Sequence, residues 1–84
     1  MEEKKLINTL KVQRAKKDLT QEKLASLVGV TRKTINTVEK GKFIPSTLLA
    51  LKLAKVLEVS VEEIFQINDN LYNFNLLGRK LNVL

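Results

Sequence analysis

The chain has 84 residues and a formal net charge of +6, with neither cysteine nor histidine. This length corresponds to one small domain, and the missing residue types exclude disulfides, the common zinc sites and Ser-His or Cys-His nucleophile pairs. Because no apolar stretch reaches the roughly 20 residues that span a bilayer and the charged N-terminus is unlike a signal peptide, we expect a cytoplasmic protein without membrane, metal, cofactor or small-molecule ligand.

N-capping residues mark the helix starts along the chain. Asn8, Thr20, Thr31, Ser46 and Ser60 each have a side-chain oxygen that can accept a free backbone N–H, and Ser60 with Glu63 forms a capping-box pattern. The predicted helices cover residues 9–17, 21–28, 32–39, 47–57 and 61–65. Apolar residues at helical spacing predict a core of Leu6, Leu10, Leu24, Leu27, Val28, Ile35, Val38, Leu48, Leu51, Ala54, Leu57, Ile64 and Phe65.

The C-terminal residues follow a different pattern. After a turn signal at 68–70, apolar residues alternate with asparagines, which predicts a β-hairpin with one apolar face; a helix over 69–77 is the alternative. Two short segments, 6–7 and 66–67, are further candidates for paired strands. We interpret 1–67 as one domain and 68–84 as an extension that either dimerises or covers the monomer core. The predicted dimerisation residues are Ile67, Leu71, Tyr72, Phe74, Leu76, Leu81 and Val83.

The positive charge is concentrated in one part of the chain. Between Lys11 and Lys42 there are nine basic and three acidic residues, so this segment carries +6 and the remainder is neutral. A polyanionic partner would bind here, whereas a solvated, lysine-rich surface is the alternative.

Residues 20–39 have the pattern of two short helices joined by a tight turn. Ala25 is small where the following helix would cross, Gly29 allows a left-handed turn, and Ile35 would anchor the next helix. The helix over 32–39 then has one face without apolar residues. These features predict a helix-turn-helix that binds double-stranded DNA.

The polar side chains fall into two predicted groups. Arg32, Lys33, Asn36 and Thr37 are predicted to contact base edges, with phosphate contact as the alternative for the first two and a solvated or phosphate-facing side chain for Asn36. Gln21, Thr31, Thr34, Lys40 and Lys42 are predicted to contact phosphate, with helix capping as the alternative for Gln21.

At these residues the chain resembles the phage Cro and cI-repressor family, most closely the small bacterial repressors of the cytolysin-repressor type. The resemblance covers about residues 5–67 and is carried by Thr20-Gln21-Glu22, Leu24-Ala25, Gly29-Val30-Thr31, Thr34-Ile35, Glu39, Gly41 and Pro45-Ser46. It implies an all-α, five-helix lambda-repressor-like domain that binds palindromic operators as a dimer. It also implies an ion pair between Arg14 and Glu39. Many phage members carry glutamines where this chain has Arg32 and Lys33, so their operator sequences do not transfer.

The sequence therefore predicts a non-enzymatic, sequence-specific transcriptional regulator. We interpret it as a repressor that acts as a homodimer on a palindromic operator through the helix over 32–39. The alternative is an antitoxin or protein-bridging module built on the same fold, because fold alone does not determine function.

Overall fold

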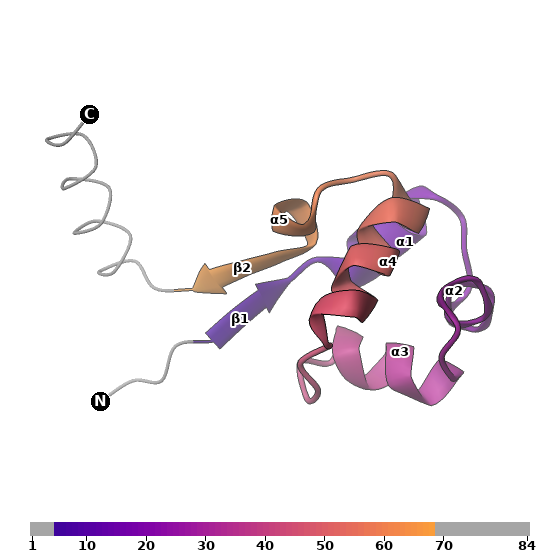
Figure 1. The fold of residues 1–84 in the computed structure, drawn as a ribbon, viewed down its shortest axis with the longest axis horizontal. Helices are drawn as coiled ribbons and strands as arrows, with labels where there is room; N and C mark the ends of the chain where they lie inside the picture. Colours follow the sequence, from indigo (N-terminus) through magenta and orange to yellow (C-terminus); the bar gives the residue numbers. More distant parts are fainter. Residues whose placement is uncertain (1–4, 69–84) are drawn as a thin grey trace, which may run out of the picture.

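The computed structural model describes residues 5–68 and contains, within that range, five helices and two short strands (Figure 1). In chain order these are β1 (Lys5–Asn8), α1 (Leu10–Lys16), α2 (Gln21–Val28), α3 (Arg32–Glu39), α4 (Thr47–Leu57), α5 (Val61–Ile64) and β2 (Phe65–Asn68). The five-helix fold is confirmed, with α2, α3 and α4 at their predicted bounds. The predicted C-terminal hairpin, with Leu71, Tyr72, Phe74, Leu76, Leu81 and Val83, lies outside the described residues.

The two strands pair as an antiparallel ribbon, with Leu6 opposite Ile67 and Ile7 opposite Gln66. This is the pairing for which segments 6–7 and 66–67 were candidates. At the base of the ribbon, the backbone N–H of Thr9 donates to the Ile64 carbonyl at 2.8 Å. The ribbon projects from the helices and brings the two ends of the described chain side by side (Figure 1).

Side-chain caps begin four of the five described helices. Thr20, Thr31, Ser46 and Ser60 each accept the backbone N–H three residues further on, at 3.0 to 3.2 Å, and the capping box of Ser60 and Glu63 is complete. Asn8 does not occupy the predicted N-cap position of α1, which Thr9 occupies without a side-chain bond. Its Oδ1 nevertheless accepts a free backbone N–H at the start of α1, as predicted, from Leu10 N at 3.2 Å, and its Nδ2 donates to the Val38 carbonyl at 3.0 Å.

Helices α1 to α4 all end with the same backbone arrangement. Each is followed by a residue with positive φ: Asp18 (56°), Gly29 (78°), Gly41 (76°) and Glu58 (61°). At the end of α2, for example, Val30 N donates to the Ala25 carbonyl at 3.0 Å and Gly29 N to the Ser26 carbonyl at 3.3 Å. This is the Schellman motif. Glycine adopts it without steric cost, whereas Asp18 and Glu58 do so under strain.

The hydrophobic core differs from the predicted one mainly in α4. The buried apolar residues are Leu10, Leu24, Ala25, Val28, Ile35, Val38, Leu49, Leu53, Ala54, Leu57 and Ile64. The predictions for Leu6, Leu27, Leu48 and Leu51 are wrong, since these side chains are 38%, 50%, 62% and 55% exposed. Leu48 and Leu51 have helical spacing along α4, but so do Leu49 and Leu53. Packing of α4 against α2 and α5 therefore decides which of the two pairs is buried.

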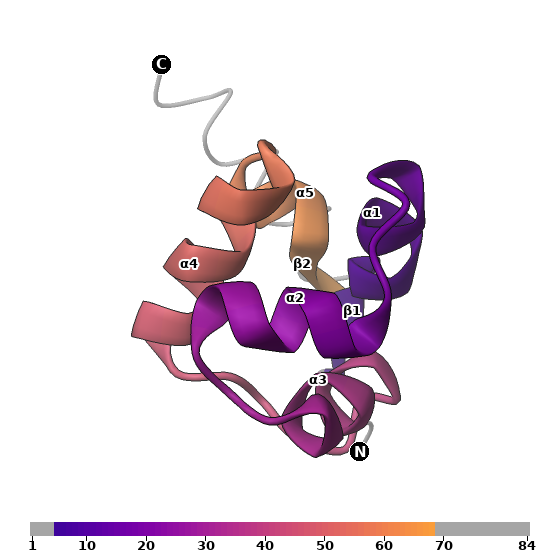
Figure 2. The ribbon, with the colours of Figure 1, turned by 90° about the vertical axis from the view of Figure 1, so that its right-hand side faces the viewer.

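The helices are arranged so that α2 lies between α4 and α1, with α3 beneath it (Figure 2). This places α3 at one side of the body, in contact with α2. Within the described range, no helix combines the length and apolar character that a membrane span requires.

Candidate nucleic-acid interface

The turn between α2 and α3 holds α3 firmly against the body. Ala25 is 2% exposed, and Ile35 and Val38 anchor the inner side of α3 at 0% and 1% exposure. Gly29 makes the left-handed turn between the helices. The cap at Thr31 then fixes where α3 begins. The opposite side of α3 is therefore held outward on a rigid support.

The outer side of α3 presents the four predicted base-contact residues, which we call the recognition face: Arg32, Lys33, Asn36 and Thr37. Arg32 and Lys33 are exposed, while Asn36 and Thr37 are half-buried. The first three of them line one shallow hollow. The Thr37 hydroxyl lies 3.0 Å from the Lys33 carbonyl and 2.9 Å from the Thr34 carbonyl, so it donates within its own helix. Its methyl group remains for apolar contact, such as with a thymine methyl.

Four of the five predicted phosphate-contact residues lie at the two ends of α3. The Thr31 hydroxyl accepts from Thr34 N at 3.2 Å, and the two threonine hydroxyls lie 3.1 Å apart. Lys40 and Lys42 are exposed at the C-terminal end of α3. Because Arg32 and Lys33 begin α3, exposed basic side chains lie at both ends of this helix and suit a polyanion that passes along it.

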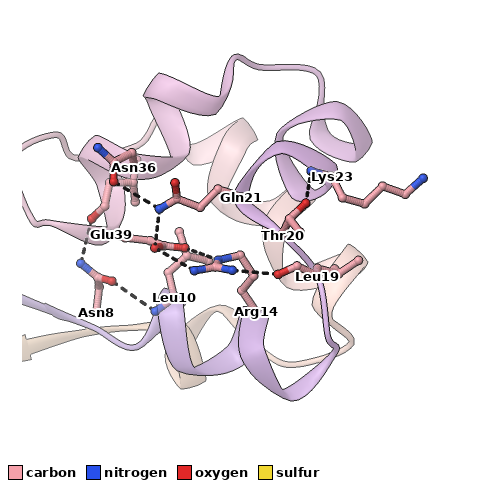
Figure 3. Close-up of polar contacts among 10 residues, drawn as sticks. Asn8, Leu10, Arg14, Leu19, Thr20, Gln21, Lys23, Asn36 and Glu39 are labelled. Carbon is pink, nitrogen blue, oxygen red and sulfur yellow. Dashed lines mark hydrogen bonds and ion pairs between the residues drawn. The ribbon is translucent and has the colours of Figure 1, made fainter.

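The fifth residue, Gln21, is bound into a polar network (Figure 3). It is half-buried at the start of α2, and its Nε2 donates to Asn36 Oδ1 at 3.2 Å and to Glu39 Oε1 at 2.9 Å. Gln21 thus links α2 to two successive turns of α3. Phosphate contact and capping were the roles predicted for Gln21 from the sequence, and this link was not predicted, because its partners are 15 and 18 positions away.

The structure brings Arg14 and Glu39 together in the same network. Arg14 Nε donates to Glu39 Oε2 at 2.6 Å and Nη2 to Oε1 at 3.3 Å, while Nη1 donates to the Leu19 carbonyl at 2.8 Å. The two side chains are only 15% and 5% exposed. Because Arg14 neutralises Glu39, the acidic residue at the end of α3 does not offset the basic groups around it. The pair also ties α1 to the end of α3.

The surface around α3 is therefore suited to binding a polyanion. Among residues 5–68, no three histidine, cysteine or acidic side chains are grouped so that they could hold a metal ion. The surface has four exposed basic side chains, which are Arg32, Lys33, Lys40 and Lys42. The Asn36 amide and Thr37 lie beside them on α3.

Comparison with known proteins finds the same motif over most of the described chain. A family model described as helix-turn-helix matches residues 10–64. An uncharacterized HTH-type transcriptional regulator of Methanocaldococcus jannaschii is 51% identical over 63 residues, which are 75% of this chain and 96% of that protein. A second such regulator, from Bacillus subtilis, is 44% identical over 62 residues, or 74% of this chain and 94% of that protein.

Two solved structures resemble this fold. The restriction-modification controller protein C.AhdI of Aeromonas hydrophila matches with a TM-score of 0.61 and 39% identity, over 64% of this chain and 82% of that one. A putative DNA-binding protein of Bacteroides fragilis matches with a TM-score of 0.67 and 30% identity, over 73% of this chain and 98% of that one.

Proposed function

This chain belongs to the Cro/cI-like helix-turn-helix family of DNA-binding transcriptional regulators, and we propose that it is a repressor that binds a palindromic operator as a homodimer. The single observation that carries the proposal is the recognition face. Four polar side chains project from a helix whose inner side is fully buried, and such a helix fits the major groove with its first residues against base edges. The predicted roles of Arg32, Lys33, Asn36 and Thr37 in base contact are part of this proposal.

A second surface supports the homodimer. Exposed or half-buried apolar side chains from β1, the segment before α4, α4 itself and β2 form what we call the apolar face: Leu6, Ile44, Leu48, Leu51, Phe65 and Ile67. Leu6, Ile44, Leu51 and Phe65 also line one groove. Large apolar patches on small proteins commonly mark interaction sites. We propose that a second copy of the chain occupies this surface.

The position of the apolar face suits a dimer that reads two half-sites. Ile44 is only four residues beyond Lys40, which caps the end of α3, so the apolar face begins close to the C-terminal end of α3. We propose that two copies joined there carry their α3 helices on the same side of the dimer. A palindromic operator requires these helices to lie about 34 Å apart, one turn of B-DNA.

The domain boundaries are proposed as 1–67 for the DNA-binding domain and 68–84 for an extension that adds to the dimer contact. Ile67 lies opposite Leu6 in the ribbon, so β2 leads directly from the apolar face into the extension. Deletion of residues 69–84 should then lower the sedimentation mass toward that of a monomer and weaken operator binding. A truncated chain that sediments as the same dimer would contradict this role.

Selection of bound sequences from a random duplex pool tests the proposed function directly. We expect a consensus with two-fold symmetry, and a protein that sediments as a dimer when bound. If a dimer neutralises about eight phosphates, log K against log salt should have a slope of about −7. An asymmetric consensus would contradict the homodimer. If no duplex is enriched even at low salt, sequence-specific DNA binding is contradicted and the protein-bridging alternative is favoured. Repression is tested by a reporter placed behind the selected sequence. The cytoplasmic location stays a prediction.

A further inference from the structure

We propose that Gln21 is a positioning residue, which holds the Asn36 amide with its nitrogen outward so that Asn36 offers a hydrogen-bond donor to the bases. The inference rests on the proposed function and adds to it the chemistry that the recognition face selects. It starts from two bonds of one amide nitrogen: Gln21 Nε2 to Asn36 Oδ1 at 3.2 Å and to Glu39 Oε1 at 2.9 Å.

The orientation follows from a chain of groups whose donor or acceptor character is fixed. Arg14 is a donor only, and the carboxylate of Glu39 that it holds is an acceptor only. The end of Gln21 that faces this carboxylate must therefore be the nitrogen. The same nitrogen faces Asn36, so the Asn36 atom next to it must be the oxygen. The Asn36 nitrogen is left on the outer side, where Figure 3 shows it pointing away from the network.

Burial makes this chain of contacts rigid. Glu39 is 5% exposed and Arg14 15%, and Arg14 is held a third time by the Leu19 carbonyl at 2.8 Å. Rotating the Gln21 amide by half a turn would place its oxygen against the buried carboxylate and leave that oxygen without a donor, which is unfavourable at a site with little water. The network therefore imposes one orientation on Asn36 before any DNA is bound.

All three side chains that line the hollow on α3 would then present donors to the groove. Arg32 and Lys33 are donors only, and Asn36 presents its NH₂ group. In the major groove the base with two adjacent acceptors, N7 and O6, is guanine, whereas cytosine offers a donor. We infer that the bases beneath Arg32, Lys33 and Asn36 are rich in acceptors, with guanine preferred at the position that Asn36 contacts.

A double-mutant cycle separates positioning from phosphate contact. Binding to the selected operator and to the same operator changed at the Asn36 position is measured for wild type, Gln21→Leu, Asn36→Ala and the double variant. We expect Gln21→Leu to lower the preference for the selected base about tenfold, and to have no further effect on that preference once Asn36 is alanine. If Gln21→Leu weakens binding to the two duplexes equally, both in wild type and in the Asn36→Ala variant, then Gln21 contacts phosphate and the proposal is overturned.

A second variant tests the orientation without disturbing Gln21. Asn36→Asp keeps an acceptor for Gln21 Nε2 but replaces the outward donor with an acceptor. We expect its selected base to change from one with an acceptor to one with a donor, cytosine or adenine. An unchanged base preference would overturn the proposed orientation. If wild type selects no sequence at all, the proposed function fails first, so the two failures are distinguishable. Thermal unfolding of each variant checks that its fold is intact.

Discussion

The recognition face and the apolar face differ in how the chain builds them. The recognition face comes from four residues within one six-residue stretch of α3, from Arg32 to Thr37, and α2 packs against this helix. The apolar face is assembled from residue 6, residues 44–51 and residues 65–67, which meet only because β1 and β2 pair beside α4. A surface made by one helix can be recognised in the sequence, whereas a surface made by several distant segments depends on the whole fold.

The largest expected effect is on the apolar face. Leu51→Glu should weaken the dimer by about 3 kcal/mol, roughly a hundredfold, because the interface would bury an unpaired carboxylate. Sedimentation against protein concentration measures this. Leu27→Glu is the matched control, since Leu27 is 50% exposed on α2 and Leu51 55% on α4. Equal effects of the two substitutions would mean that the apolar face is not the dimer surface.

The recognition face should respond differently. Arg32→Ala is expected to weaken binding to the selected operator by about 1–3 kcal/mol and to relax base choice at one position, with the dimer unchanged. Titration with operator and with scrambled duplex measures both effects. Lys55→Ala, which removes an exposed charge from α4, should weaken the two duplexes alike and only slightly. An unaltered consensus for Arg32→Ala would show that Arg32 contacts phosphate only.

Substitutions at the C-terminal ends of α2 and α4 should have smaller effects on stability, with opposite signs. Gly29→Ala should destabilise the fold by about 1 kcal/mol, because alanine is strained at a φ of 78°. A steric clash does not contribute, since an added Cβ would meet no atom within 4 Å. Glu58→Gly relieves the same strain at the end of α4, where φ is 61°, and removes only an exposed contact with Lys17, so it should be neutral or stabilising by up to about 1 kcal/mol. Chemical denaturation measures both. Two changes of the same sign would contradict the strain argument.

The smallest expected effect is on the pH dependence of stability. A hydrogen bond and the charge of Lys17 lower the pKa of the exposed Glu58 carboxyl below its ordinary value. The stability that this contact contributes is present above the ordinary pKa and is lost as the pH falls through the lowered, folded-state pKa. Glu58→Gln should therefore flatten the acid side of the melting temperature profile slightly. Superimposable profiles would mean that the contact contributes nothing.

The accuracy of the sequence predictions depended on how local their signals were. Caps and turn residues lie within three or four positions of the groups they bind, so the bounds of α2, α3 and α4 were predicted correctly. The apolar spacing in α4 fitted two stripes, and the choice of Leu48 and Leu51 over Leu49 and Leu53 was wrong because only packing distinguishes them. The bond between Gln21 and Asn36 had no local signal at all.

The way in which α3 begins and ends has a consequence for protein engineering. Its limits are set by the Thr31 cap and the Gly41 turn, and its attachment by Ile35 and Val38, none of which belongs to the recognition face. The outer residues can therefore be exchanged as a cassette while the scaffold is kept. Arg32, Lys33 and Thr37 are the positions to randomise when retargeting the protein to a new operator. Asn36 should be varied only together with Gln21.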